Sequence, residues 1–157
     1  MVHLLKFTQI IHASIGSAWD FFSNPHSLSK ITPPELDLTI LTDLPERIYP
    51  GMMIQYRVRP LFGIPALWVT EITQAEWEKS FVDEQRIGPY RIWHHEHNFK
   101  RLDGERIEVN DRITYVLPFG PLGDFVHPFL VKPQLARIFA FREKAVGDVF
   151  HGCDTTT

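Results

Sequence analysis

Alternating polar and apolar residues on both sides of Asp103-Gly104 predict a long β-hairpin covering about residues 93–117. Side chains alternate across a strand, so every second residue shares a face. The mostly apolar face carries Trp93, His95, His97 and Phe99 on the first arm, and Ile107, Val109, Asp111, Ile113, Tyr115 and Leu117 on the second. The hairpin therefore predicts an apolar surface that holds two imidazoles and one carboxylate, with His94 on the opposite, solvent-facing side.

The register of the hairpin is constrained by the need to place both apolar faces on one side of the sheet. Paired residue numbers must then have an even sum, because a slip of one residue turns every side chain over. We predict a three-residue loop with Gly104 in the left-handed conformation. The predicted pairs are Trp93 with Ile113, His95 with Asp111, His97 with Val109 and Phe99 with Ile107.

Other period-two patterns predict strands at residues 3–11, 36–40, 52–58, 68–72 and 80–87. With the hairpin arms they make about seven strands at short spacing, which is typical of an antiparallel meander. The strand at residues 80–87 carries Asp83 and Gln85 on one face. The pattern leaves open whether this face is concave and contacts a ligand or is exposed to solvent.

Helical spacing appears at two places. Ser14 is a plausible N-cap for a short helix that ends at Asn24-Pro25, and a second short helix follows at residues 25–31. Near the C-terminus, apolar residues return at helical spacing from residue 122 to about residue 150. Pro128 and Pro133 each remove an amide donor, so we expect a kink or break between them and a regular helix from about Pro133. Its charged outer side is assigned to Arg137, Arg142, Glu143, Lys144 and Asp148.

Size and composition predict one domain at residues 1–151, followed by a flexible tail at residues 152–157. The chain has 157 residues, 44% of them hydrophobic, which is enough to bury a core without disulfides. The formal net charge of -3 provides no basic surface for nucleic acid. The single cysteine, Cys153, excludes an intrachain disulfide, and no apolar run is long enough to span a membrane. We therefore expect a cytoplasmic protein.

The order strand, two short helices, six strands and long terminal helix resembles the START and Bet v 1-like (SRPBCC) superfamily. Its α+β helix-grip fold wraps a curved antiparallel sheet around the last helix. The segment 19–25 is similar to the first-helix motif of that superfamily, and segments 88–95 and 111–123 are similar to a bacterial cyclase/dehydrase-like ligand-binding subgroup. The resemblance covers nearly the whole chain. It implies a hydrophobic pocket between sheet and terminal helix, and no conserved catalytic set, cofactor or metal.

Residues on the predicted inner faces are candidates for ligand contact, because pockets combine aromatic surface with a few polar groups. The candidates are Tyr56, Trp68, Asp83, Trp93, His95, His97, Phe99, Asp111, Tyr115 and Phe139. The leading hypothesis is a non-enzymatic or weakly specialised binder of a hydrophobic small molecule such as a lipid, an isoprenoid or an aromatic compound.

Three alternatives accompany this hypothesis. His95 or His97 could act as the acid or base of a cyclase or dehydratase, oriented by Asp111; the same groups could equally form a structural hydrogen-bond network. The histidines could also supply two zinc ligands, with Asp111 or Asp83 as the third, but His-x-His alone is a weak pattern and we expect no metal site. Finally, the apolar segment 59–65 could be a lid, a homodimer contact or a docking loop for another protein.

Overall fold

The computed structural model describes residues 1–61 and 63–151. Its strands are β1 (Val2–His12), β2 (Thr39–Ile40), β3 (Met53–Leu61), β4 (Ile64–Glu76), β5 (Ser80–Ile87), β6 (Ile92–Arg101) and β7 (Arg106–Val116). Its helical elements are α1 (Ile15–Phe22), the 3-10 helices η1 (Pro25–Ile31) and η2 (Pro34–Leu36), α2 (Pro121–Val126), the π-helical turn η3 (His127–Val131) and α3 (Lys132–His151). The predicted tail and Cys153 lie outside the described residues.

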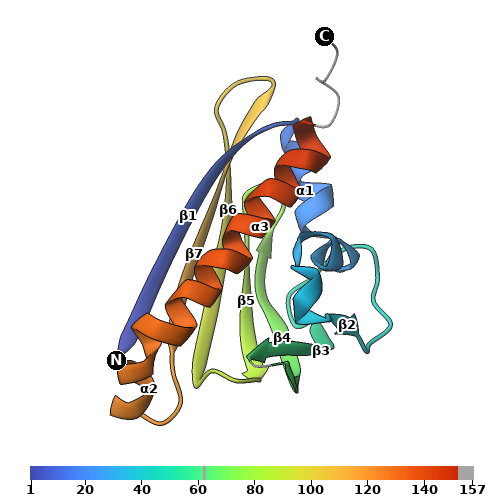
Figure 1. Ribbon diagram of the computed structural model, residues 1–157. Coiled ribbons are helices and arrows are strands. Elements are labelled where there is room, and N and C mark those ends of the chain that lie inside the picture. The colour runs from blue at the N-terminus through green and yellow to red at the C-terminus, as the bar shows by residue number, and fades with distance from the viewer. Residues whose placement is uncertain (62, 152–157) are drawn as a thin grey trace.

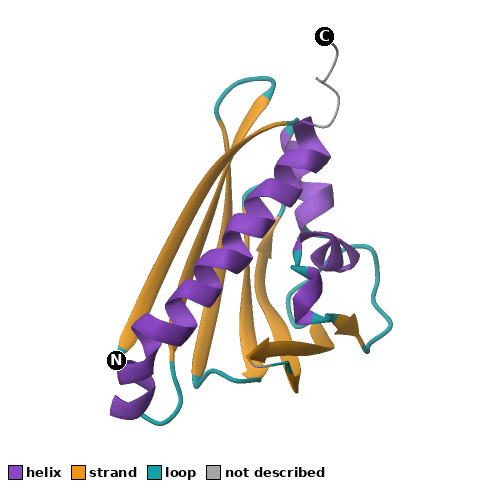
Figure 2. Cartoon of the chain, in the orientation of Figure 1, coloured by secondary structure: helices purple, strands orange, loops and turns teal. Residues whose placement is uncertain are grey.

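The strands form one antiparallel seven-stranded sheet in the order β1-β7-β6-β5-β4-β3-β2. The sheet curves, and α3 runs diagonally across its inner side, while α1 and the short helices cover one end (Figure 1). The helices of residues 1–61 and 63–151 thus lie on the same side of the sheet (Figure 2). This arrangement confirms the predicted α+β helix-grip fold.

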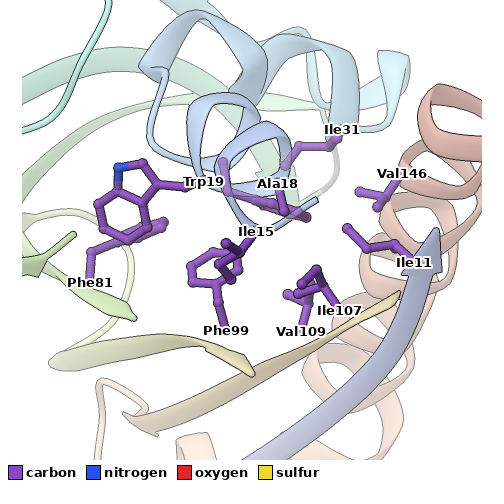
Figure 3. Packing of buried hydrophobic residues seen from close by; sticks show 11 residues of the cluster. Ile11, Ile15, Ala18, Trp19, Ile31, Phe81, Phe99, Ile107, Val109 and Val146 are labelled. Atoms are coloured by element: carbon purple, nitrogen blue, oxygen red, sulfur yellow. The ribbon is translucent and has the colours of Figure 1, made fainter. Parts of the chain in front are cut away.

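The short helix α1 closes one end of the structure. Its N-cap is Ser14, as predicted, and the Ser14 hydroxyl accepts a hydrogen bond from the Ser17 amide at 3.1 Å. The apolar side of α1 buries Trp19, whose ring meets that of Phe99 at a centroid distance of 5.7 Å. Figure 3 shows this cluster, in which α1 packs against side chains from β6 and β7. This packed apolar cluster closes one end of the space between the sheet and α3.

The hairpin of β6 and β7 has the predicted inward face, but its predicted register is wrong by two residues. The observed pairs are Trp93 with Tyr115, His95 with Ile113, His97 with Asp111 and Phe99 with Val109. The loop comprises residues 102–105, and the Asp103 carboxylate closes it by accepting hydrogen bonds from the amides of Glu105 and Arg106 at 3.0 and 2.8 Å. Gly104 does not adopt a positive φ. Because the shift is even, every side chain keeps its predicted face.

The predicted strand at residues 36–40 is wrong over its first part. Only Thr39 and Ile40 pair with β3, because η2 ends in the left-handed residue Asp37, at φ 44°, which interrupts the extended backbone. The Asp37 carboxylate instead accepts a hydrogen bond from the Arg59 guanidinium at 2.9 Å. In the apolar segment 59–65, β3 continues to Leu61 and β4 begins at Ile64, while Phe62 lies outside the described residues.

The C-terminal helical region agrees with the predicted helical spacing from residue 122 and the predicted regular helix from about Pro133. It starts at Pro121 with α2, passes through the π-helical turn η3, and continues as α3 from Lys132, close to the predicted start of the regular helix. Pro128 lies within the turn, in agreement with the expected irregularity between the two prolines. Within the part of the chain that the structure describes, no helix combines the length and hydropathy needed to span a bilayer.

Candidate ligand cavity and its polar cluster

A cavity of about 380 Å³ lies between the inner face of the sheet and α3. Its wall is mainly apolar and draws on the short helices, the central strands and α3. The apolar lining includes Ile31, Ile54, Val58, Ile72, Leu135 and Ile138. A volume of this size falls within the range of about 300–1,000 Å³ that is common for small-molecule sites.

Aromatic side chains form one wall of the cavity. The ring of Trp68 meets the ring of Trp93 edge to face at a centroid distance of 5.5 Å and that of Tyr90 at 5.7 Å. The Trp68 indole N–H is buried and has no hydrogen-bond partner among the described residues. The Tyr56 and Thr70 hydroxyl oxygens lie 2.9 Å apart, and burial raises the pKa of the Tyr56 phenol. The aromatic rings therefore define the shape of this wall and present few polar atoms to the cavity.

A compact polar cluster interrupts the apolar wall where β5, β6, β7 and α3 meet. The His97 imidazole lies between two carboxylates, with Nε2 2.8 Å from Asp83 Oδ2 and Nδ1 2.8 Å from Asp111 Oδ1. His95 repeats the arrangement, with Nε2 3.0 Å from Asp111 Oδ1 and Nδ1 3.5 Å from Asp83 Oδ2. From α3, Arg142 Nη2 donates to Asp111 Oδ1 at 3.4 Å. All of these side chains are largely buried.

Charge balance in this cluster follows from its contacts. Burial and the charge of His97 lower the pKa of His95, despite its two carboxylate neighbours. For His97, burial acts to lower the pKa, but hydrogen bonds to Asp111 and Asp83 outweigh it and raise the pKa. The pKa of Asp111 lies well below its ordinary value, because Arg142 and the two histidines outweigh its burial. The Arg142 charge offsets one of the two carboxylates, and the direction of the His97 pKa shift favours a proton that offsets the other.

Arg142 was wrongly assigned to the outer side of the C-terminal helix. Its side chain is 12% exposed and lines the cavity. The sequence does hold a signal for this position, because Leu135, Phe139, Arg142 and Val146 follow one another at steps of three or four residues. Such spacing places side chains on one face of a helix, and the other three are buried in the core. Arg142 was assigned to the outer side because it is charged, although its spacing places it on the inner face.

Most of the predicted ligand-contact residues come together around the cavity. Those that line it are Tyr56, Trp68, Asp83, Trp93, His95, His97 and Phe139. Phe99 instead packs in the cluster under α1, and Asp111 lies behind the two histidines. The open question about β5 is also answered, since Asp83 faces the cavity while Gln85 bonds the backbone of Tyr90 through both side-chain amide atoms, at 2.6 and 3.2 Å.

The remaining candidate, Tyr115, belongs to a second cluster that holds α2 and η3 against the sheet. Its hydroxyl lies 2.6 Å from His127 Nε2, and burial raises the pKa of the Tyr115 phenol to about 12. The ring of His3 stacks on His127 at 3.8 Å, and His3 Nε2 lies 3.0 Å from Asp124 Oδ1. These contacts join the start of β1 to the helical segment. No sequence pattern pointed to the contacts of His3, because they link residues more than a hundred positions apart.

Comparison with known proteins relates the chain to solved structures through its fold. No protein-family model matches the chain, and no curated protein does. The Zhui aromatase/cyclase from Streptomyces sp. R1128 superposes with a TM-score of 0.73 and 15% identity, over 96% of this chain and 94% of that one. A START superfamily protein from Mycobacterium smegmatis gives 0.69 and 13%, over 96% and 98%.

A plant protein gives a similar result. The major latex-like protein 151 of Panax ginseng superposes with a TM-score of 0.68 and 13% identity, over 95% of this chain and 97% of that one. Identities this low show the fold alone. The chain thus has the START-like helix-grip fold that its sequence resembled.

Proposed function

We propose that this protein binds a hydrophobic small molecule in the cavity between the sheet and α3. The cavity itself is the observation that carries the proposal, because its wall is mainly aliphatic and aromatic and its ionisable groups Asp83, His95, His97 and Arg142 lie together in one cluster. Burial of apolar ligand surface would supply most of the affinity, at about 25 cal/mol per Å² before the costs of association. The cluster around His95 and Arg142 would orient a polar group of the ligand. A lipid, an isoprenoid or an aromatic compound fits this description.

Filling the cavity tests the proposal. Ile54 lines the cavity from β3 and is 5% exposed, so Ile54→Trp places an indole in the space that a ligand would occupy. We expect at least about a tenfold loss of affinity for N-phenyl-1-naphthylamine, a neutral apolar fluorescent probe, since each 1.4 kcal/mol of lost binding energy is tenfold. Native mass spectrometry of the gently purified wild type should also reveal a co-purifying organic molecule.

The matched control places the same indole on the outside. Ile10 lies on the outer face of β1 and is 47% exposed, so Ile10→Trp should leave probe affinity unchanged. Probe binding that survives Ile54→Trp with an intact fold, or a wild type that binds neither probe nor natural ligand, would refute the cavity as a binding site.

A second candidate function is a cyclase or dehydratase, because His95 lines the cavity and its Nε2 lies 3.0 Å from Asp111. An imidazole oriented by a carboxylate is a common general acid or base. One structural neighbour is described as an aromatase/cyclase, although the likeness extends to the fold alone.

Separating binding from turnover distinguishes the two functions. If the protein is an enzyme, His95→Gln abolishes loss of water from a panel of apolar hydroxy-ketones, followed by mass spectrometry, while probe affinity stays within about threefold. A wild type that binds these compounds and returns them unchanged supports binding without catalysis.

A further inference from the structure

Three potential metal ligands meet at the polar side of the cavity. Asp83 Oδ2 lies 2.8 Å from His97 Nε2 and 3.5 Å from His95 Nδ1. One ligand atom from each of the three residues lies within 4.8 Å of the others. Two ligands of a tetrahedral zinc ion with bonds of 2.0–2.1 Å are about 3.3 Å apart, so both distances from the carboxylate bracket the separation that a metal needs.

The far nitrogens of both imidazoles are fixed in the way that metal-bound histidines require. Asp111 Oδ1 lies 3.0 Å from His95 Nε2 and 2.8 Å from His97 Nδ1, and Arg142 holds the same oxygen. Histidines that bind metals usually donate their second N–H to a carboxylate, which fixes the tautomer and aims the first nitrogen at the ion. Here one carboxylate performs this role for both rings.

These tautomers leave electron pairs facing one another. If Asp111 accepts from both rings, His95 Nδ1 and His97 Nε2 each direct a lone pair toward Asp83 Oδ2, which is also an acceptor. The other tautomer of His97 donates from Nε2 to Asp83 and directs its Nδ1 lone pair toward Arg142 Nη2 at 3.3 Å. One proton on His97 satisfies its own contact and leaves His95 Nδ1 opposite the carboxylate without a donor between them. A cation bound by all three atoms satisfies every lone pair at once.

We propose that Asp83, His95 and His97 bind a divalent transition-metal ion, Zn²⁺ by ligand type, at the wall of the cavity. The two-histidine, one-carboxylate set is common to zinc and other first-row metal sites that retain an open coordination position. All three residues line the cavity, so the open position faces it and would hold a water or an oxygen of a bound molecule.

The surrounding charges are compatible with such an ion. With neutral histidines, the two carboxylates and Arg142 sum to one negative charge, and a divalent ion changes this sum to one positive charge. An anionic oxygen at the open position would make the cluster neutral. Arg142 Nη2 lies 3.4 Å from Asp111 Oδ1 and 3.3 Å from His97 Nδ1, so its guanidinium supports the orienting carboxylate on the side of His97 away from Asp83.

Metal titration of the full chain, freed of any histidine tag and treated with a chelator, tests the proposal. We expect Zn²⁺ to bind with one-to-one stoichiometry in calorimetry and Co²⁺ to give the visible absorption of a low-symmetry site. His95→Gln and Asp83→Asn should each lower Zn²⁺ affinity by more than about 100-fold. Asp111→Asn should lower it by about 10- to 100-fold and preserve the stoichiometry, because it removes the orienting carboxylate and no ligand.

His94 is the matched control, since it lies on the same strand but on the outer face. Its Nδ1 lies 2.7 Å from Glu84 and its Nε2 3.3 Å from Glu96, so it is also the place for adventitious surface binding. His94→Gln should leave the affinity unchanged. The proposal is overturned if folded wild-type protein binds no Zn²⁺, if binding survives both His95→Gln and Asp83→Asn, or if it is lost with His94→Gln.

Circular dichroism in the near ultraviolet shows whether each variant is folded. If a variant of the buried site is not folded, the titrations of the wild type and of His94→Gln together decide between the buried site and the surface site. The apolar probe experiment is run without metal, so failure of either proposal leaves the result of the other intact.

Discussion

Asp111 is an almost fully buried carboxylate whose contacts come from two other elements. The imidazoles of His95 and His97 reach it from β6, and the Arg142 guanidinium reaches it from α3. An ionised group loses several kcal/mol of hydration when it is buried, and only close partners of opposite charge offset this loss. The cluster therefore links α3 to the sheet through charge as well as through apolar packing.

Replacing Arg142 tests whether its charge stabilises the buried Asp111 carboxylate. In Arg142→Met the apolar stem remains and the charge that supports Asp111 is lost, so the free energy of unfolding should fall by about 3–5 kcal/mol in urea denaturation. Arg137→Met is the control, because its side chain is 77% exposed and its partner Glu35 is also at the surface. That variant should stay within about 0.5 kcal/mol of wild type. Equal losses in both variants would contradict a structural role for the buried charge.

The segment from α2 through η3 closes one end of the cavity and depends on a close approach of the backbone. Gly123 in α2 faces Pro118, and a Cβ at this position would overlap the Pro118 carbonyl oxygen and lie 3.1 Å from Cβ of Leu117. Gly123 also lines the cavity. The glycine therefore sets how closely α2 sits against the end of β7, and with it the shape of that wall.

Adding one methyl group at Gly123 tests the close approach of α2 to Pro118. Gly123→Ala should lower the free energy of unfolding by about 1–3 kcal/mol, since the overlap is with backbone and the helix must shift. Gly104→Ala serves as its control, because a Cβ there meets nothing within 4 Å and φ is not positive. Thermal unfolding should show the control unchanged or slightly stabilised. A Gly123→Ala variant as stable as Gly104→Ala would mean that α2 is not held at this distance.

Features that depend on local periodicity were predictable from the sequence. Alternation identified the inward faces of β6 and β7, and Ser14 together with helical spacing gave α1. The register was not predictable, because a loop closed by the Asp103 side chain and a loop closed by a left-handed Gly104 both keep the same faces inward. Arg142 was missed although its spacing places it on the inner face of α3, because the carboxylate that compensates its buried charge, Asp111, is 31 positions away in the chain and on another element.

The fold of the whole molecule also has a consequence for its biosynthesis. The first strand, β1, pairs along all eleven of its residues with β7, from Val2 opposite Val116 to His12 opposite Arg106. A ribosome must therefore synthesise all the elements between β1 and β7 before these two strands can pair, and pairings between distant segments form slowly. Until then, the apolar side of β1 stays uncovered, and the nascent protein is most prone to aggregate during this interval.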